Sequence, residues 1–210
     1  AFLLVGLVGS ILLKGTGFGT SSGEWPFGAH EILMILLASA AYFTTPARFR
    51  EENGFSMEPI REVAILFAGL FVTMTAPVLI LNQRSEVLGL ENPIHYFWST
   101  GLLSSWLDNA PTYLTFAGAA AGQFGVSAAS PRFLSDLLAT GPSAAPYLAA
   151  VSCGAVFMGA YTYIGNGPNF MVKAIAEKSG VSMPSFFGYL GYSVPILTPL
   201  FLLMSLEWAI

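Results

Sequence analysis

The sequence reads Trp106-Leu107-Asp108-Asn109-Ala110-Pro111-Thr112-Tyr113-Leu114, and 57 positions later it nearly repeats itself as Tyr163-Ile164-Gly165-Asn166-Gly167-Pro168-Asn169-Phe170-Met171. Both stretches run aromatic, aliphatic, variable, Asn, small, Pro, polar, aromatic, aliphatic. Each lies inside a hydrophobic run, where proline removes a backbone donor and small residues let the chain leave helical geometry. We therefore expect two helix breaks lined by oxygen-bearing groups, which at membrane depth usually form a binding site.

The composition predicts an integral membrane protein. Hydrophobic residues make up 54% of the chain and charged residues 10%, and the mean hydropathy is +0.66. In an ordinary soluble domain about 25% of the residues are charged. The apolar stretches are continuous rather than alternating, which favours transmembrane helices. We expect a lipid bilayer as the surroundings, with a bacterial inner membrane favoured, and no nucleic-acid partner.

The first 93 residues are predicted to form transmembrane helices that precede the two breaks. Ala1–Leu13 is an apolar run without an initiator Met or a basic leader, so we interpret it as the end of a helix cut by truncation. A Gly- and Ser-rich connector, Gly15–Gly28, a helix, His30–Thr45, and a polar loop, Pro46–Pro59, follow. Ile60–Asn82 then has the length of a full span, because about 20 residues at 1.5 Å each cross a core of about 30 Å.

The region around the first repeat is too short for two spans. Ile94–Leu107 has about 14 residues and Thr112–Gly122 about 11, so at helical rise neither arm extends much beyond ~21 Å. Two half-length arms that meet at Asp108–Pro111 indicate a re-entrant hairpin, residues 94–122, which enters and leaves the membrane on the same side. The alternative is a single kinked helix that spans the membrane.

The basic residues favour the hairpin. With a hairpin, five of the eight basic residues lie on one side of the membrane and three on the other, whereas with a kinked helix they divide four and four. The positive-inside rule therefore orients only the hairpin topology, and it places the loop that carries Arg48 and Arg50 in the cytoplasm.

The second repeat is predicted to interrupt a helix that crosses the membrane. After a long loop, Gln123–Pro146, residues 147–180 form one crossing that is broken at Gly165–Pro168. Its second half, Asn169–Ser179, begins after a proline and ends before Gly180, a good C-terminal cap. The last helix, residues 186–208, contains two prolines and is expected to bend.

Asp108 is the only carboxylate deep in any of these apolar segments. An ionised carboxylate without a partner is strongly unfavourable in lipid, so the group needs a cation or a proton. Burial favours the protonated form and a nearby cation favours the ionised form, so one group can alternate between the two. The alternative is that Asp108 only caps the second arm of the hairpin, because Asp before a proline commonly starts a helix.

Hard cations such as sodium are bound by oxygen atoms of carboxylates, amide side chains and freed backbone carbonyls. The candidate substrate- and ion-binding residues are therefore Asp108, Asn109, Thr112, Thr162, Gly165, Asn166, Asn169 and Ser105. Of these, Asp108, Asn109 and Asn166 are the candidate sodium ligands. A hydrogen bond between helices explains each polar residue, taken singly, equally well. No bound cofactor is expected, and sodium and protons enter as transported or coupling ions.

Ser105–Thr112 resembles the hairpin signature of the ion-transporter superfamily, which includes sodium/proton antiporters, citrate and dicarboxylate carriers and arsenite pumps. Thr162–Asn169 is similar to the second signature of that superfamily, which lies in an unwound helix. The run from Lys173 to Phe187 looks like the sodium/proton antiporter and citrate-transporter-like branch. The resemblance covers roughly residues 60–210, and the two signatures occur in the expected order.

The resemblance implies an all-α polytopic membrane fold built from two inverted repeats. This chain would hold only the second repeat, with its re-entrant hairpin and its broken transmembrane helix. Residues 1–93 would belong to a scaffold and residues 94–210 to half of a moving transport domain. The resemblance also implies a homodimer when the protein is full length, and a preceding repeat of the same protein that completes the site.

Secondary active transport is the function that these features favour. Sodium/proton antiport at Asp108 is the first choice and cation-coupled citrate or carboxylate transport the alternative, because Asp108 would repel an anion unless a cation lies between them. A non-transporting membrane subunit is an alternative of another class, but it does not explain two matched breaks. An enzyme is not expected, because no paired nucleophile and base is present.

Overall fold

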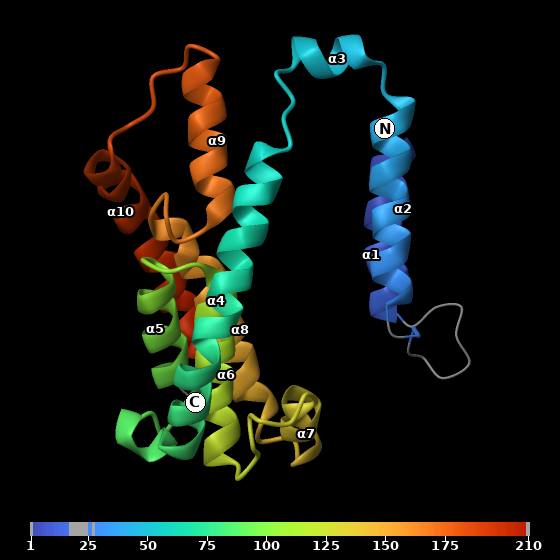
Figure 1. The fold of residues 1–210 in the computed structure, drawn as a ribbon. Coiled ribbons are helices and arrows are strands. Elements are labelled where there is room, and N and C mark those ends of the chain that lie inside the picture. Colours follow the sequence, from blue (N-terminus) through green and yellow to red (C-terminus); the bar gives the residue numbers. More distant parts are fainter. Residues whose placement is uncertain (1, 17–24, 27, 209–210) are drawn as a thin grey trace. The chain divides into compact units, whose positions relative to one another are not determined.

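The structure, a computed structural model, describes residues 2–16, 25–26 and 28–208. All regular secondary structure in these ranges is helical. Figure 1 shows these helices in chain order, from α1 to α10. The predicted all-helical class is therefore confirmed for these ranges. By their internal contacts the residues divide into two compact units, Ala1–Glu62 and Val63–Ile210.

The N-terminal unit begins with two apolar helices. α1, Phe2–Thr16, packs along α2, Ala29–Thr44, and Lys14 Nζ lies 2.9 Å from Glu31 Oε1 where α1 ends and α2 begins. The helix predicted at His30–Thr45 is confirmed to within one residue at each end. The predicted Gly- and Ser-rich connector lies mostly outside the described residues, which omit 17–24 and 27.

α3, Ala47–Glu52, lies inside the segment that the sequence predicts to be a polar loop, so that prediction was wrong there. Pro46, with a φ of −54°, presets the backbone directly before the first turn of α3. Arg48 Nε lies 2.6 Å from Glu52 Oε1, and an ion pair between residues four apart supports a short helix.

α4, Glu58–Gln83, is a long helix that is tied near its end to α6, Asn109–Gln123. Asn82 is buried, and its Nδ2 donates to the carbonyl oxygens of Gly118 at 2.9 Å and Val126 at 2.8 Å. The backbone N–H of Ala128 donates in turn to Asn82 Oδ1 at 3.1 Å. One amide therefore fixes α4 against both α6 and the loop that follows α6.

α5, Pro93–Ser104, and α6 form an antiparallel helical hairpin. The rings of Tyr96 and Phe116 pack edge to face with centroids 6.5 Å apart. At the open end, Gln123 donates a hydrogen bond to the carbonyl oxygen of Leu90, just before α5. At 1.5 Å per residue the two arms are about 18 and 22 Å long, so both are shorter than a membrane core of about 30 Å.

α7, Phe133–Ala139, is a second short helix in a segment predicted to be a loop, here Gln123–Pro146, so that prediction was wrong for these residues. Three apolar residues anchor α7, because Leu137 is fully buried in the core and Phe133 and Leu134 pack against it. Ser130 Oγ donates to Asp136 Oδ2 at 2.9 Å and so joins the segment before α7 to the first turn of that helix.

The helix that carries the second repeat is interrupted, as predicted. α8, Ala145–Met158, passes into a 3₁₀ turn, η2, Gly159–Tyr161, and then into the non-helical segment 162–166 before α9, Gly167–Lys178. The predicted cap at the end of α9 is confirmed, since Gly180 has a φ of 82° and its N–H donates to the Glu177 carbonyl oxygen at 3.0 Å.

α10, Phe186–Ser205, continues as a 3₁₀ turn, η3, Leu206–Trp208. Among the described residues, Phe186–Trp208 is the one helical stretch both long and apolar enough to cross a membrane, with a mean hydropathy of 1.6. The span predicted at Ile60–Asn82 lies within the helix α4, which includes the apolar stretch Phe67–Gln83.

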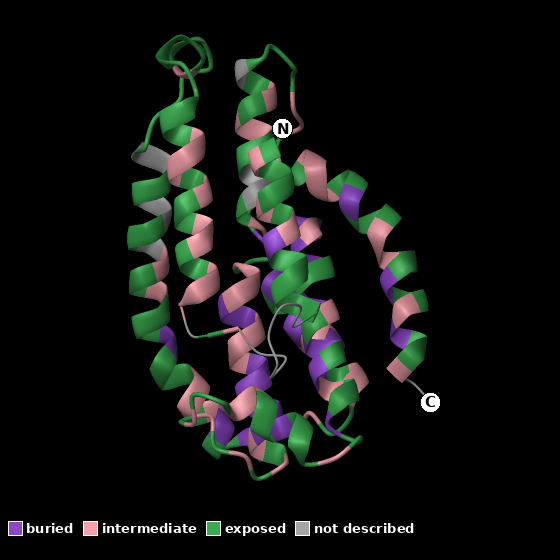
Figure 2. Cartoon of the chain, turned by 90° about the vertical axis from the view of Figure 1, so that its right-hand side faces the viewer, coloured by how far each residue is buried: buried purple, intermediate pink, exposed green. Residues whose placement is uncertain are grey.

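The core of the larger unit lies where α5, α6 and α8 meet. Gly101 of α5 and Gly154 of α8 let these two helices approach closely, because a Cβ on Gly154 would collide with the carbonyl oxygen of Phe97. Figure 2 shows the buried residues gathered along the inner helices of this unit. Many large apolar side chains outside this core are exposed, among them Val156 and Leu203, which is typical of a surface that faces lipid or a partner.

Candidate functional site

The first break is the segment 105–108 between α5 and α6. The sequence placed it at Asp108–Pro111, but residues 109–111 form the first turn of α6. Proline fits there, because the N–H groups of a first helical turn have no intrahelical partner to lose. The second break is shifted in the same direction, to residues 162–166, because Pro168 lies in the first turn of α9.

Asp108 occupies the N-cap position of α6, but its carboxylate accepts no hydrogen bond from that helix. The side chain is half-buried, and no described residue gives it a hydrogen bond or an ion pair. The geometry therefore gives no support to a role as a helix cap alone. All acceptor positions of this carboxylate remain open to a cation or a proton.

Thr162 ties the two breaks together. Its Oγ1 donates to the carbonyl oxygen of Ser105 at 2.5 Å, and it accepts the backbone N–H groups of Ile164 at 3.2 Å and Gly165 at 2.9 Å. Ser105 Oγ donates to the carbonyl oxygen of Met158 at 3.1 Å. Thr162 and Ser105 are both buried, and each lies immediately before one of the two repeated stretches. The two repeated stretches therefore lie directly against each other.

Asn109, in the first turn of α6, also joins the two breaks. The carbonyl oxygens of Ala155 and Gly165 face its amide, and because carbonyl oxygens only accept, the amide nitrogen points to them. In this orientation Nδ2 lies 2.8 Å from the Ala155 oxygen and 2.9 Å from the Gly165 oxygen. Ser104 donates from Oγ to the same Ala155 oxygen at 2.6 Å. The amide therefore links the breaks through its donor end.

Gly165 lies among backbone oxygens. A Cβ at this position would come within 2.7 Å of the carbonyl oxygens of Gly159 and Ser104 and within 2.8 Å of that of Ser105. Only glycine fits so close to three oxygens. Carbonyl oxygens gathered where a helix unwinds are the ligands that hard cations use.

The other predicted residues lie at the starts of the two helices. Thr112 is buried and donates from Oγ1 to the Asp108 carbonyl oxygen at 3.0 Å. Asn169 Nδ2 lies 3.4 Å from the Thr162 carbonyl oxygen, and Asn166 is the half-buried N-cap residue of α9. The structure thus joins Ser105, Asn109, Thr162 and Gly165 directly and places Asp108, Thr112, Asn166 and Asn169 at the helix starts.

An aromatic stack flanks the second break. Tyr163 is buried and stacks on Tyr189 with ring centroids 4.2 Å apart. Lys173 Nζ lies 5.6 Å from the centroid of the Tyr163 ring and 2.6 Å from Glu177 Oε1. This basic group lies beyond the second repeat, about one and a half turns into α9.

The arrangement offers binding groups of both signs. α6 and α9 begin at the two breaks, and neither N-cap side chain accepts a bond from its own helix (Figure 1). Pro111 and Pro168 have no N–H, and the Asn169 N–H donates to the Asn166 carbonyl oxygen at 2.9 Å. The first-turn N–H groups of Asn109, Ala110 and Gly167 and the positive ends of two helix dipoles are therefore available to an anion. The Asp108 carboxylate and the freed carbonyl oxygens are available to a cation. Such a site can hold a carboxylate substrate together with a cation.

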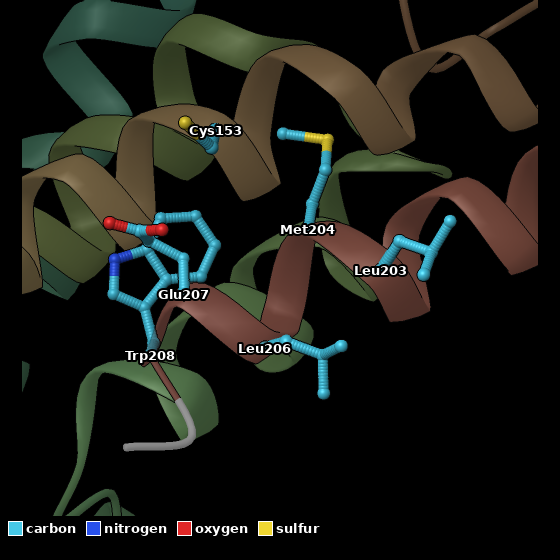
Figure 3. Close-up of a pocket in the computed structure, with 6 residues that line it drawn as sticks. All are labelled: Cys153, Leu203, Met204, Leu206, Glu207 and Trp208. Carbon is cyan, nitrogen blue, oxygen red and sulfur yellow. The ribbon is translucent and has the colours of Figure 1, made fainter.

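A cavity of about 660 Å³ lies away from both breaks, between α8 and the C-terminal helix. Figure 3 shows its lining residues, Cys153, Leu203, Met204, Leu206, Glu207 and Trp208. None of these residues belongs to either break, so this cavity is separate from the candidate site. Within the part of the chain that the structure describes, no three His, Cys, Asp or Glu side chains cluster to hold a metal.

Comparison with known proteins identifies the family of the chain. A family model described as "Putative citrate transport" matches residues 2–208, which include both repeats and the N-terminal helices. No curated protein and no solved structure matches the chain. The family match confirms the resemblance to the citrate-transporter-like branch that the two repeats suggested. The chain therefore belongs to the family described as "Putative citrate transport".

Proposed function

We propose that this protein is a secondary active transporter that carries citrate, or a chemically similar carboxylate, together with a coupling cation held by Asp108. The family supports the carboxylate substrate. The half-buried, unpartnered carboxylate of Asp108 supports the cation. The sequence alone places sodium/proton exchange first and citrate transport second, and membership of this family reverses that order.

Coupling follows from the charges at the first break. Two like charges about 4 Å apart repel by about 4 kcal/mol at an effective dielectric constant of about 20. Citrate at the start of α6 therefore binds poorly while Asp108 is ionised and holds no cation. A cation on Asp108 removes this repulsion, and citrate in turn strengthens the binding of the cation, because the coupling between two ligands is reciprocal.

Sodium is the cation that the oxygen-rich surroundings favour. Asp108, Asn109 and Asn166 are the proposed side-chain ligands, and the backbone oxygens around Gly165 are the proposed carbonyl ligands. A proton on Asp108 achieves the same neutralisation. The backbone N–H groups of Asn109, Ala110 and Gly167 are the proposed partners of the citrate carboxylates.

The proposed membrane arrangement rests on the short helices. We place α5 and α6 as a re-entrant hairpin and α8 to α9 as one broken crossing, with residues 94–210 as half of a transport domain and residues 1–93 as scaffold. The other half of the site comes from a preceding inverted repeat of the same protein, which assembles as a homodimer in a bacterial inner membrane. The arms of the hairpin, each shorter than a membrane core, support this arrangement.

Uptake of labelled citrate into proteoliposomes that contain the whole protein tests the proposal. An inward sodium gradient is expected to drive accumulation of citrate, and a pH gradient alone is expected to drive it only if the coupling cation is a proton. Equal uptake with and without both gradients would contradict cation coupling. No uptake of citrate or of any small di- or tricarboxylate would contradict the substrate class.

Sodium/proton exchange without a carboxylate is the second candidate function. The open carboxylate of Asp108 favours it, because a single acid can bind a sodium ion and a proton in turn. A pH-sensitive dye inside the same vesicles distinguishes the two functions. Alkalinisation or acidification driven by sodium in the absence of citrate indicates exchange, whereas a pH change that requires citrate indicates coupled transport.

A further inference from the structure

A groove in the N-terminal unit has no part in the site described above. It has a volume of about 370 Å³ and is lined by Ala38, Ala41, Tyr42, Thr45, Arg50, Phe55, Met57 and Ile60. These residues come from α2 and its C-cap residue, from α3, from the segment before α4 and from the first turn of α4, all within residues 1–62. The Thr45 hydroxyl donates back to the Ala41 carbonyl oxygen at 2.6 Å, so the lining is apolar except for Arg50.

Arg50 is held rigidly at this groove. Its Nη1 donates to the carbonyl oxygens of Tyr42 at 2.5 Å and Thr45 at 2.7 Å, and its guanidinium carbon lies 4.5 Å from the centroid of the Tyr42 ring. The Tyr42 ring is supported by Phe55, with centroids 6.2 Å apart. No described residue accepts a hydrogen bond from Nε or Nη2 of Arg50, so these donors are free for a ligand.

Arg48, on the same short helix, is different. It pairs with Glu52 at 2.6 Å, its side chain is 83% exposed, and it does not line the groove. α3 therefore presents one fixed, unneutralised guanidinium at the end of an apolar groove. The ligand that complements such a groove has an apolar chain and an anionic head.

The place of the groove along the chain indicates where that ligand comes from. α2 is an apolar helix, and it ends at Thr44, directly before the charged helix α3. A change from apolar to charged residues is typical of the level at which hydrocarbon meets lipid headgroups. We infer that the groove binds one acyl chain of an anionic phospholipid, with the lipid phosphate on the guanidinium of Arg50.

Native mass spectrometry of the whole protein released from nanodiscs tests this inference. The wild type is expected to retain phosphatidylglycerol in preference to phosphatidylcholine. Arg50→Gln is expected to weaken phosphatidylglycerol retention about fivefold, the effect of one basic side chain at an anionic surface. Arg48→Gln is the matched control and is expected to retain the lipid as the wild type does. An unchanged preference in Arg50→Gln overturns the inference, as does an equal loss in Arg48→Gln.

A second variant tests the groove itself. Ala41→Phe fills the groove and keeps Arg50 with its two carbonyl bonds, so it remains informative if Arg50→Gln does not fold. It is expected to lose phosphatidylglycerol retention, and full retention overturns the acyl-chain position. Retention of palmitate as strong as that of phosphatidylglycerol overturns the choice of a phospholipid. If the protein forms a dimer without lipid and both variants weaken that dimer, the inference of a bound phospholipid is overturned, because a second copy of the chain then occupies the groove.

Discussion

Thr162 Oγ1, directly before the second repeat, donates a hydrogen bond of 2.5 Å to the carbonyl oxygen of Ser105, the residue directly before the first repeat. The carbonyl oxygen lies where α5 ends, and the same hydroxyl accepts two backbone N–H groups of the second break. One buried hydroxyl thus satisfies backbone groups on both breaks. The breaks are therefore one structural element, and a change at either is expected to alter the other.

Thr162→Val is expected to destabilise the protein by about 1–3 kcal/mol, because it leaves buried backbone groups at both breaks without their partner. The midpoint of thermal unfolding in detergent measures the loss. Thr162→Ser keeps the hydroxyl and is the matched control, with a much smaller expected effect. A valine variant as stable as the serine variant would show that this hydroxyl does not hold the breaks together.

Gly165→Ala is expected to destabilise the protein by about 1–3 kcal/mol, the usual effect of forcing an extra carbon into a packed site. The added Cβ would lie within 2.8 Å of three carbonyl oxygens. Gly167→Ala is the control, since a Cβ at Gly167 meets no atom within 4 Å. Thermal unfolding of the two variants side by side is the measurement, and equal midpoints would contradict the close packing at Gly165.

The sequence predicts the two breaks because their chemistry is local. Asparagine, a small residue and proline occur in this order twice, which is enough to predict that Trp106–Leu114 and Tyr163–Met171 interrupt helices. The positions of the breaks were predicted a few residues too late, because proline was taken as the breaking residue. The structure puts Pro111 and Pro168 inside the first turns of the next helices, where a missing N–H is harmless.

What the sequence could not supply is the long-range contact between the breaks. Nothing local marks Ser104, Ala155 or Gly159 as neighbours, because their proximity depends on how α5 packs against α8. The short helices α3 and α7 were missed for a related reason. Each has too few residues for a periodic pattern, and α7 is held by contacts of Phe133, Leu134 and Leu137 with the distant core.

Asn82→Ala is expected to destabilise the protein by about 2–4 kcal/mol, because this buried amide makes three hydrogen bonds that join α4 to α6 and to the loop after it. Gln83→Ala changes an exposed neighbour and is expected to have little effect. Chemical denaturation of both variants in mixed micelles gives the difference. If the two variants lose the same stability, the amide does not hold α4 in place.

Asp108→Asn is expected to leave thermal stability close to that of the wild type, because the carboxylate has no hydrogen bond or ion pair with a described residue. Sodium-driven citrate uptake by this variant is expected to fall to background. Asp136→Asn, at an exposed acid bonded to Ser130, is the matched control and is expected to transport normally. A large drop in the unfolding midpoint of Asp108→Asn would indicate a structural role for the acid instead.

The sodium dependence of citrate binding by the wild type and by Asp108→Asn tests the central claim most directly. Citrate affinity is measured by calorimetry on the whole protein at low and high sodium, with ionic strength held constant by choline. In the wild type, sodium is expected to tighten citrate binding about tenfold, within the usual range of coupling between two sites. In Asp108→Asn, citrate affinity is expected to be the same at both sodium concentrations. A variant in which sodium still tightens citrate binding as it does in the wild type would contradict the claim that Asp108 holds the coupling cation.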